Sequence, residues 1–201
     1  MLRFVRTLIF ILLLAALTAA SGLLWLSPDP RYTIEAWLRG DRYWDYDDLI
    51  IAAANKNGVD PMLIKSIVWR ESAFHPDKVG TSGERGLMQV GEAAAADWAK
   101  AEKVETFMPT DLFDPKVNLE VGVWYLSRGL ERWKAKADPI PFALAEYNAG
   151  RSRVDRWIAE SQRGEGAKAE DLIAAIDFPL TRKYVETITA RHRFYRERGR
   201  M

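Results

Sequence analysis

The chain of 201 residues contains no cysteine. This absence excludes disulfide bonds, thiolate zinc sites, cysteine nucleophiles and lipid attachment at an N-terminal cysteine. Histidine is almost as scarce, because His75 and His192 are the only two and lie far apart in sequence. The sequence therefore offers little basis for a histidine-rich metal site, and we expect neither a metal nor a cofactor. A chain without cysteine also suits an oxidising compartment.

An excess of charge of either sign is also lacking. The 29 Lys and Arg residues are balanced by 28 Asp and Glu, for a net charge of +1. Proteins that bind nucleic acid usually carry a strongly basic domain, so we expect no nucleic-acid partner. The balance does not require a highly charged substrate.

One long uncharged run stands at the N-terminus. Arg3 and Arg6 precede an apolar stretch that extends from Thr7 to Ser27. About 20 apolar residues span a bilayer, whereas the core of a signal peptide has roughly 7–15. The small residues Ala19 to Gly22 offer a cleavage site, but Leu23 to Leu26 prolong the apolar stretch beyond them. The sequence favours an uncleaved signal anchor over residues 1–27, with a cleaved signal peptide as the alternative.

Both alternatives export the rest of the chain. With the arginines on the cytoplasmic side and Trp25 at the far interface, we expect a location on the periplasmic face of the inner membrane. If the signal is cleaved, the protein is periplasmic. Residues 28–44, with Pro28 and Pro30, are predicted to be a tether, and residues 45–201 to be one domain.

The pattern after about residue 45 is helical. Asp60-Pro61 is a favourable helix start, and Ile64, Ile67 and Val68 recur at helical spacing behind it. The other helices are expected near 49–57, 88–101, 115–133, 142–147, 152–158 and 181–196, with loops over 75–86 and 161–167. No segment is a convincing strand, so we predict an all-α domain.

Glu71 stands at the end of the apolar helix that begins at Asp60-Pro61. Burial beside aromatic side chains disfavours a charged carboxylate, so its pKa should rise toward the range of a general acid. Taken alone, a glutamate at a helix end is more often a surface residue. Its interpretation depends on the segments that follow.

Several short motifs follow Glu71 in order. Each alone is ordinary, because Gly86-Leu87-Met88-Gln89 can be a helix start and Asn148-Ala149-Gly150 a helix end. Together they resemble the soluble lytic transglycosylase (SLT) domain of family 1. The matching segments are Glu71-Ser72-x-Phe74-x-Pro76, Gly83-x-x-Gly86-Leu87-Met88-Gln89, Phe113-Asp114-Pro115-x-x-Asn118, Ala145-x-Tyr147-Asn148-Ala149-Gly150 and Thr181-Arg182-x-Tyr184-Val185. The resemblance covers roughly residues 45–196.

This resemblance implies a lysozyme-like helical fold and a substrate. The family cleaves the β-1,4 bond between N-acetylmuramic acid and N-acetylglucosamine in peptidoglycan and releases 1,6-anhydromuramyl products without net hydrolysis. The expected partners are peptidoglycan glycan strands and, through the N-terminal helix, the inner membrane. The sequence does not say whether the protein has a protein partner.

The resemblance also implies the site residues. Glu71 would be the sole catalytic acid and base, and no metal would be needed. The substrate-binding residues would be Ser72 beside it, Met88 and Gln89 along the sugar cleft, Tyr147 and Asn148 next to the glutamate and the sugar, and Tyr184 as a hydrogen-bond donor near the carboxyl group.

The chain departs from the family pattern at a few positions. Gly80 stands where a substrate-contacting Ser is usual, and Leu180 where a Glu usually precedes Thr-Arg. Gly91-Glu92 replaces Met-Pro, and Asp177 replaces a Pro. Glu146, the nearest rival carboxylate, is expected to be exposed or supporting. Two alternatives therefore stay open: a goose-type-like muramidase that hydrolyses the same bond, and a catalytically weak protein that binds the wall or assists assembly.

Overall fold

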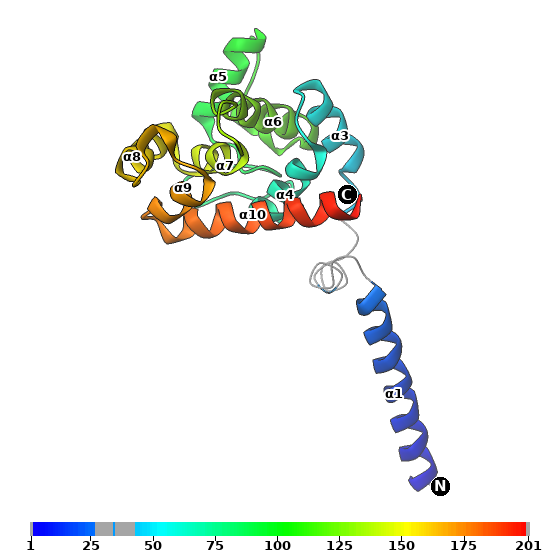
Figure 1. Ribbon diagram of the computed structural model, residues 1–201. Helices are drawn as coiled ribbons and strands as arrows, with labels where there is room; N and C mark the ends of the chain where they lie inside the picture. The colour runs from blue at the N-terminus through cyan, green and yellow to red at the C-terminus, as the bar shows by residue number, and fades with distance from the viewer. Residues whose placement is uncertain (1, 27–33, 35–42, 200–201) are drawn as a thin grey trace. The chain divides into compact units, whose positions relative to one another are not determined.

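The computed structural model describes residues 2–26, 34 and 43–199 and divides into two compact units, 1–44 and 45–201. The second unit is helical throughout (Figure 1). Its helices are α3 (Asp47–Lys56), α4 (Pro61–Ser72), α5 (Glu92–Glu102), α6 (Pro115–Arg132), α7 (Ile140–Ala149), α8 (Arg151–Glu160), α9 (Ala169–Ala175) and α10 (Pro179–Arg198), with the 3-10 turns η1 (Pro109–Phe113) and η2 (Gly164–Gly166). Within the described residues there is no strand, only isolated β-bridges. The all-α prediction is confirmed.

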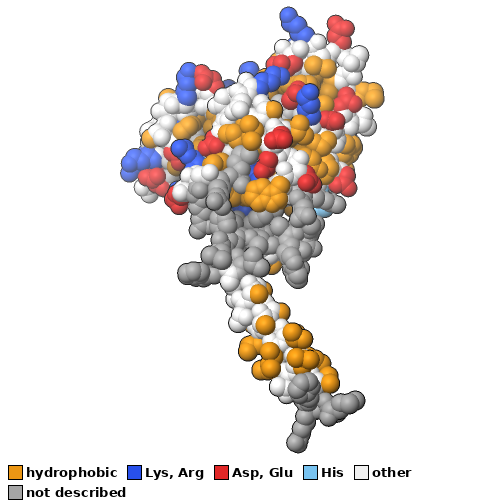
Figure 2. Space-filling view, turned by 90° about the vertical axis from the view of Figure 1, so that its right-hand side faces the viewer, with side chains coloured by type: hydrophobic (Ala, Val, Ile, Leu, Met, Phe, Trp, Pro, Cys, Tyr) orange, Lys and Arg blue, Asp and Glu red, His pale blue; other side chains and the backbone are white. Residues whose placement is uncertain are grey.

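The first unit contains the helix α1 (Leu2–Leu26). Its 25 residues rise by ~37 Å, enough to cross the ~30 Å hydrocarbon core of a bilayer. Residues 5–22 are exposed, and Figure 2 shows hydrophobic side chains along the helix. By length and composition alone, Val5–Gly22 is the one described segment able to span a membrane. Most of the predicted tether over 28–44 lies outside the described residues, as does the side chain of Trp25.

Two helix starts follow the rules that the sequence suggested. Asp60 accepts a hydrogen bond from the Met62 N–H at 2.9 Å and so caps α4. Asp114 does the same for α6 through the Val117 N–H at 3.0 Å. Each cap satisfies an N–H group that has no partner inside its own helix. Because proline follows each cap, its fixed φ and missing N–H fit the first helical position.

Two helix predictions need correction. The segment expected to be helical from residue 88 forms a loop up to Gly91, and α5 begins only at Glu92. Gln89 has φ 48°, a left-handed backbone conformation that no α-helix can contain. The short helix α9 was not expected, because its seven residues are too few to show a periodic apolar pattern.

Two helices organise the second unit. α6 packs against α3, α5 and α7, and α10 runs beneath α9, α7 and α4 (Figure 1). The buried Lys65 of α4 donates a hydrogen bond of 2.8 Å to the Asp47 carboxylate of α3. Burial lowers the pKa of Lys65, and the contact with Asp47 opposes that change. This packing brings the end of α4, the end of α7 and the first half of α10 to one place.

Candidate active site

Glu71 occupies the last turn of α4, where the helix gives way to a loop. Ala73 and Phe74, which follow it, have φ values of 50° and 62°. Left-handed backbone is strained for residues other than glycine, and such strain gathers at functional sites. With Gln89, these residues are three of the four non-glycine residues with positive φ in the described part of the chain. The backbone therefore turns sharply just after the end of α4 and again at Gln89.

Burial gives Glu71 an unusual acidity. The pKa of its carboxyl group rises from an ordinary 4.5 to about 7, chiefly because burial disfavours the charged form. Donation from Tyr184 and the positive charges of Arg70 and Lys78 oppose the rise, whereas the negative charge of Glu84 adds to it. Near neutral pH, Glu71 is therefore ready both to give and to accept a proton.

Two tyrosines share the electrostatic environment of Glu71. Tyr147 comes from α7 and Tyr184 from α10. Burial raises the pKa of both phenols well above 10, and the negative charge of Glu71 raises them further. Both tyrosines therefore remain neutral donors. The Tyr184 hydroxyl is buried and makes no hydrogen bond of ordinary geometry within the described residues, yet it lies near enough to Glu71 to donate toward its carboxylate.

A buried amide holds the loop that contains Met88 and Gln89. Asn118 of α6 is 0% exposed, and its Oδ1 accepts a hydrogen bond from the Met88 N–H at 2.8 Å. Its Nδ2 donates to the carbonyls of Arg85 at 2.7 Å and Leu112 at 2.8 Å. The backbone of Gly86 passes so close that an added Cβ would overlap Asn118. One side chain thus satisfies three backbone groups and fixes the loop on α6.

The Met88 and Gln89 side chains take different directions from this loop. The side chain of Met88 is buried and packs where a Cβ on Gly122 would overlap it. Its carbonyl accepts a hydrogen bond from the Tyr147 hydroxyl at 2.9 Å. Gln89 is half-buried, and its Nε2 donates to the carbonyls of Lys78 at 3.1 Å and Gly86 at 3.0 Å. Their contact with a sugar stays a prediction.

Ser72 and Asn148 also have partners in the protein. Ser72 is buried and donates to the carbonyl of Val68 at 3.1 Å, within its own helix. Asn148 is exposed at the end of α7, and its Oδ1 accepts a hydrogen bond from the Thr181 hydroxyl of α10 at 2.8 Å. Thr181 therefore joins the two final motifs. The substrate-binding roles of Ser72 and Asn148 stay predictions.

The sequence did not point to Glu84, which fills the space beside Gly80. A Cβ on Gly80 would overlap the Glu84 carboxylate and would stand 3.0 Å from the Gln89 Oε1. The same carboxylate accepts a hydrogen bond from the Ser82 N–H at 3.1 Å. The absence of a side chain at Gly80 thus leaves room for Glu84, a second acidic group near Glu71. Only the conformation of the loop brings Gly80 and Glu84 together, so no pattern in the sequence could have indicated this contact.

Other acidic groups have supporting roles. Glu146 is buried rather than exposed, forms an ion pair with Arg132 and accepts a hydrogen bond from the Trp133 indole at 2.7 Å. Glu92, the first residue of α5, forms an ion pair with Arg85 at 2.9 Å. Within the described ranges, no cluster of three or more His, Asp or Glu residues is arranged to hold a metal ion.

Comparison with known proteins finds a family model and several relatives that match this chain. Residues 48–170 match the family model described as the transglycosylase SLT domain. The soluble lytic murein transglycosylase of Salmonella typhimurium is 28% identical over 174 residues, which cover 82% of this chain and 26% of that protein. The membrane-bound lytic murein transglycosylase F of Desulfosudis oleivorans is 35% identical over 109 residues, or 53% of this chain and 22% of that protein.

Solved structures share the fold. The 70 kDa soluble lytic transglycosylase of Escherichia coli has a TM-score of 0.66 and 27% identity, covering 77% of this chain and 24% of that one. A complex of the 70 kDa soluble lytic transglycosylase with bulgecin A has a TM-score of 0.69 and the same identity and coverage. The chain thus spans about a quarter of the length of these relatives. Since the family model matches more than half of the chain, the protein belongs to the transglycosylase SLT domain family.

Proposed function

We propose that this protein is a murein lytic transglycosylase. It cleaves the β-1,4 bond between N-acetylmuramic acid and N-acetylglucosamine and leaves a 1,6-anhydromuramyl end. The observation that carries the proposal is Glu71, a carboxyl group with a pKa of about 7 beside two neutral tyrosines. Family membership and the lytic transglycosylase names of the relatives support it.

The proposed reaction uses Glu71 twice. Protonated Glu71 gives its proton to the glycosidic oxygen as the bond to the muramyl C1 breaks, and the muramyl N-acetyl oxygen bonds to C1 in place of the leaving sugar. The Glu71 carboxylate then takes the proton of the muramyl C6 hydroxyl. The C6 oxygen attacks C1 and displaces the N-acetyl oxygen, which closes the anhydro ring. A pKa near neutrality serves both proton transfers.

The surrounding groups have separate tasks in this scheme. Tyr184 donates toward the Glu71 carboxylate and so stabilises it once its proton has left. Tyr147 and the loop held by Asn118 keep Met88 and Gln89 in fixed positions. Preorganised donors of this kind lower the barrier because they need not reorient during the reaction.

Analysis of the products tests the reaction class. The full-length chain, solubilised in detergent, should release muropeptides with anhydro ends, which are lighter by one water than hydrolysis products. Hydrated reducing ends would instead show the muramidase. Glu84 is the observation that favours this second function, because a hydrolase that inverts configuration needs a second carboxylate to activate water.

The pH dependence of cleavage should report the neighbours of Glu71. Because the first step needs protonated Glu71, kcat/KM should fall about tenfold per pH unit above a pKa of about 7. Glu84→Gln removes a negative charge and should move this fall to lower pH. Tyr184→Phe removes a donor to the carboxylate and should move it to higher pH. Rates measured from pH 5 to pH 9 check both shifts, and equal shifts in one direction would contradict the assignment.

We also propose that α1 anchors the protein on the periplasmic face of the inner membrane. The length and exposed apolar side chains of Val5–Gly22 support this location, as do the membrane-bound relatives. The intact mass of the chain extracted from membranes decides between the uncleaved anchor and a cleaved signal.

A further inference from the structure

A cavity of about 590 Å³ lies apart from Glu71, between the helices α5, α6, α7 and α8. Asp97, Lys100 and Ala101 line it from α5, Trp124, Tyr125, Arg128 and Arg132 from α6, Glu146 from α7 and Arg151 from α8. Its walls thus combine two aromatic rings with four basic and two acidic side chains. Ligand sites have similar volumes, and the many charged side chains of this lining favour a ligand group that is itself charged.

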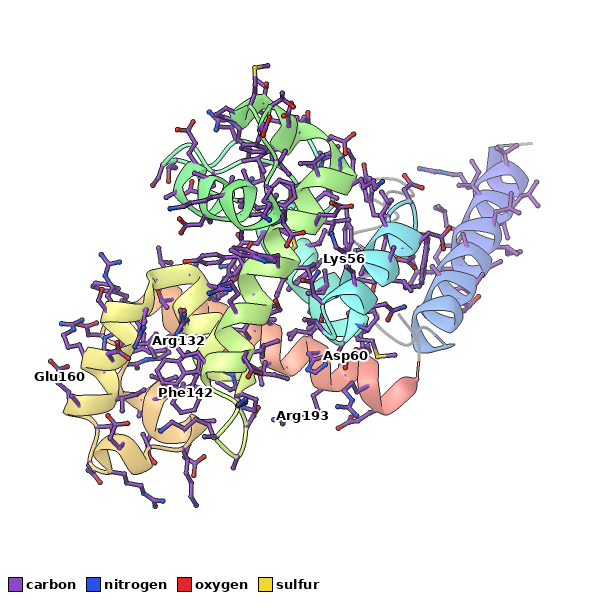
Figure 3. The ribbon with its side chains drawn as sticks, turned by 90° about the horizontal axis from the view of Figure 1, so that it is seen from above. Lys56, Asp60, Arg132, Phe142, Glu160 and Arg193 are labelled. Atoms are coloured by element: carbon purple, nitrogen blue, oxygen red, sulfur yellow. The ribbon has the colours of Figure 1, made fainter. Side chains whose placement is uncertain are left out.

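Part of this charge is already used by the fold. Arg132 forms an ion pair with the buried Glu146, at the junction of α6 and α7 that Arg132 and Phe142 mark in Figure 3. Arg151 forms an ion pair of 3.3 Å with Asp155, one turn further along α8. These two arginines therefore have partners before any ligand arrives.

Two cations remain for a ligand. Arg128 lies over the ring of Trp124, with its guanidinium carbon 5.0 Å from the ring centroid. A guanidinium that lies over an indole ring still has N–H groups with which it can bind a carboxylate in a bidentate manner. Lys100 faces the same cavity from α5. Within the described residues, neither Arg128 nor Lys100 has an ion-pair partner, and Asp97 is the one acidic wall residue outside the Glu146 pair.

The cavity borders the residues around Glu71. Tyr125, one of its walls, packs edge-on against Tyr147, with the ring centroids 5.8 Å apart. Tyr147 in turn lies in the electrostatic environment of Glu71 and binds the carbonyl of Met88. Two tyrosine rings, Tyr147 and Tyr125, thus connect the surroundings of Glu71 to the wall of the cavity. The cavity is therefore placed to receive a substituent that extends away from a sugar bound at Glu71.

We propose that this cavity is a subsite for the stem peptide of peptidoglycan, with Arg128 and Lys100 binding a peptide carboxylate and the Trp124 ring packing on its apolar part. The inference rests on the proposed function, because it assumes that a peptidoglycan strand occupies the site of Glu71. The lactyl carboxylate of the muramyl unit has the same chemistry as a peptide carboxylate. It is attached directly to the sugar, however, and therefore reaches less far than the carboxylate of a stem peptide.

A comparison of two substrates tests the subsite. Full-length protein in detergent is assayed on glycan strands that carry tetrapeptide stems and on strands stripped by an amidase, which retain the lactyl carboxylate. Arg128→Glu should lower kcat/KM about tenfold on the peptide-bearing strands, mainly through KM, and less than twofold on the stripped strands. Lys100→Glu, from a different helix, should give a smaller loss of the same selectivity.

Lys134→Glu is the matched control, because it makes the same change of charge at an exposed residue outside the cavity. It should leave the ratio of the two substrates unchanged. Equal losses on both substrates with Arg128→Glu would mean that the cavity binds the glycan itself. No loss on either substrate would mean that the cavity binds no part of the substrate. Each of these results would overturn the proposal of a peptide subsite. Cleavage of stripped strands by the unchanged protein tests the proposed function without the stem peptide. Failure of the subsite proposal is therefore distinguishable from failure of the proposed function.

Discussion

Replacing Glu71 by Gln should lower the rate of glycan cleavage by about 10³-fold, because one side chain supplies both proton transfers. Glutamine has nearly the same shape but neither gives nor takes a proton under these conditions. Since Glu71 is half-buried and its pKa of about 7 leaves it about half protonated at pH 7, the neutral amide should be accepted without loss of folding. The measurement is the initial rate of anhydro-muropeptide release by the full-length variant in detergent.

Glu160→Gln serves as the control, since it makes the same chemical change at an exposed helix end. Its rate should equal that of the unchanged protein. Cleavage that persists in Glu71→Gln would refute the assignment of the acid and base. If cleavage is lost but the variant still complements a deletion in cells, the wall-binding or assembly role is favoured.

The sequence was sufficient for features that depend on local chemistry. Asp60-Pro61 and Asp114-Pro115 mark helix starts because an aspartate cap and a proline act within one turn. The position of Glu71 at the end of an apolar helix was equally readable, and the rise in its pKa follows from burial, as expected. These features need no knowledge of the rest of the chain.

Features that depend on contacts between distant segments were not readable. The segment from Met88 to Gly91 has a helix-compatible composition, but Asn118, 30 residues away from Met88, binds its backbone and holds it as a loop. Glu84 faces Glu71 only because the loop folds back beside Gly80. Glu146 was expected to be exposed or supporting, and its burial depends on Arg132 from another helix. Tertiary contacts decided each of these cases against local preference.

Asn118→Ala should reduce the free energy of unfolding of the 45–201 unit by about 3–5 kcal/mol. The change removes three hydrogen bonds and leaves three buried backbone groups, on Met88, Arg85 and Leu112, without this partner. Each unsatisfied buried group costs ~1–3 kcal/mol, and water that enters the vacated space offsets part of the total. Urea denaturation of the full-length chain in detergent, followed by tryptophan fluorescence, measures the loss.

Asn55→Ala makes the same substitution on the exposed surface of α3 and should change the free energy of unfolding by less than about 0.5 kcal/mol. A loss below ~1 kcal/mol for Asn118→Ala would show that the loop is held by other contacts. Gly86→Ala should disturb the same contact between the loop and Asn118. Its added Cβ would overlap Asn118 and the Leu112 carbonyl, and the φ of 77° at this position is strained for alanine. If both variants act by releasing this loop from α6, their combined effect should be smaller than the sum of the two. Activity should then fall with each variant alone, since the loop that carries Met88 and Gln89 is the element both variants release.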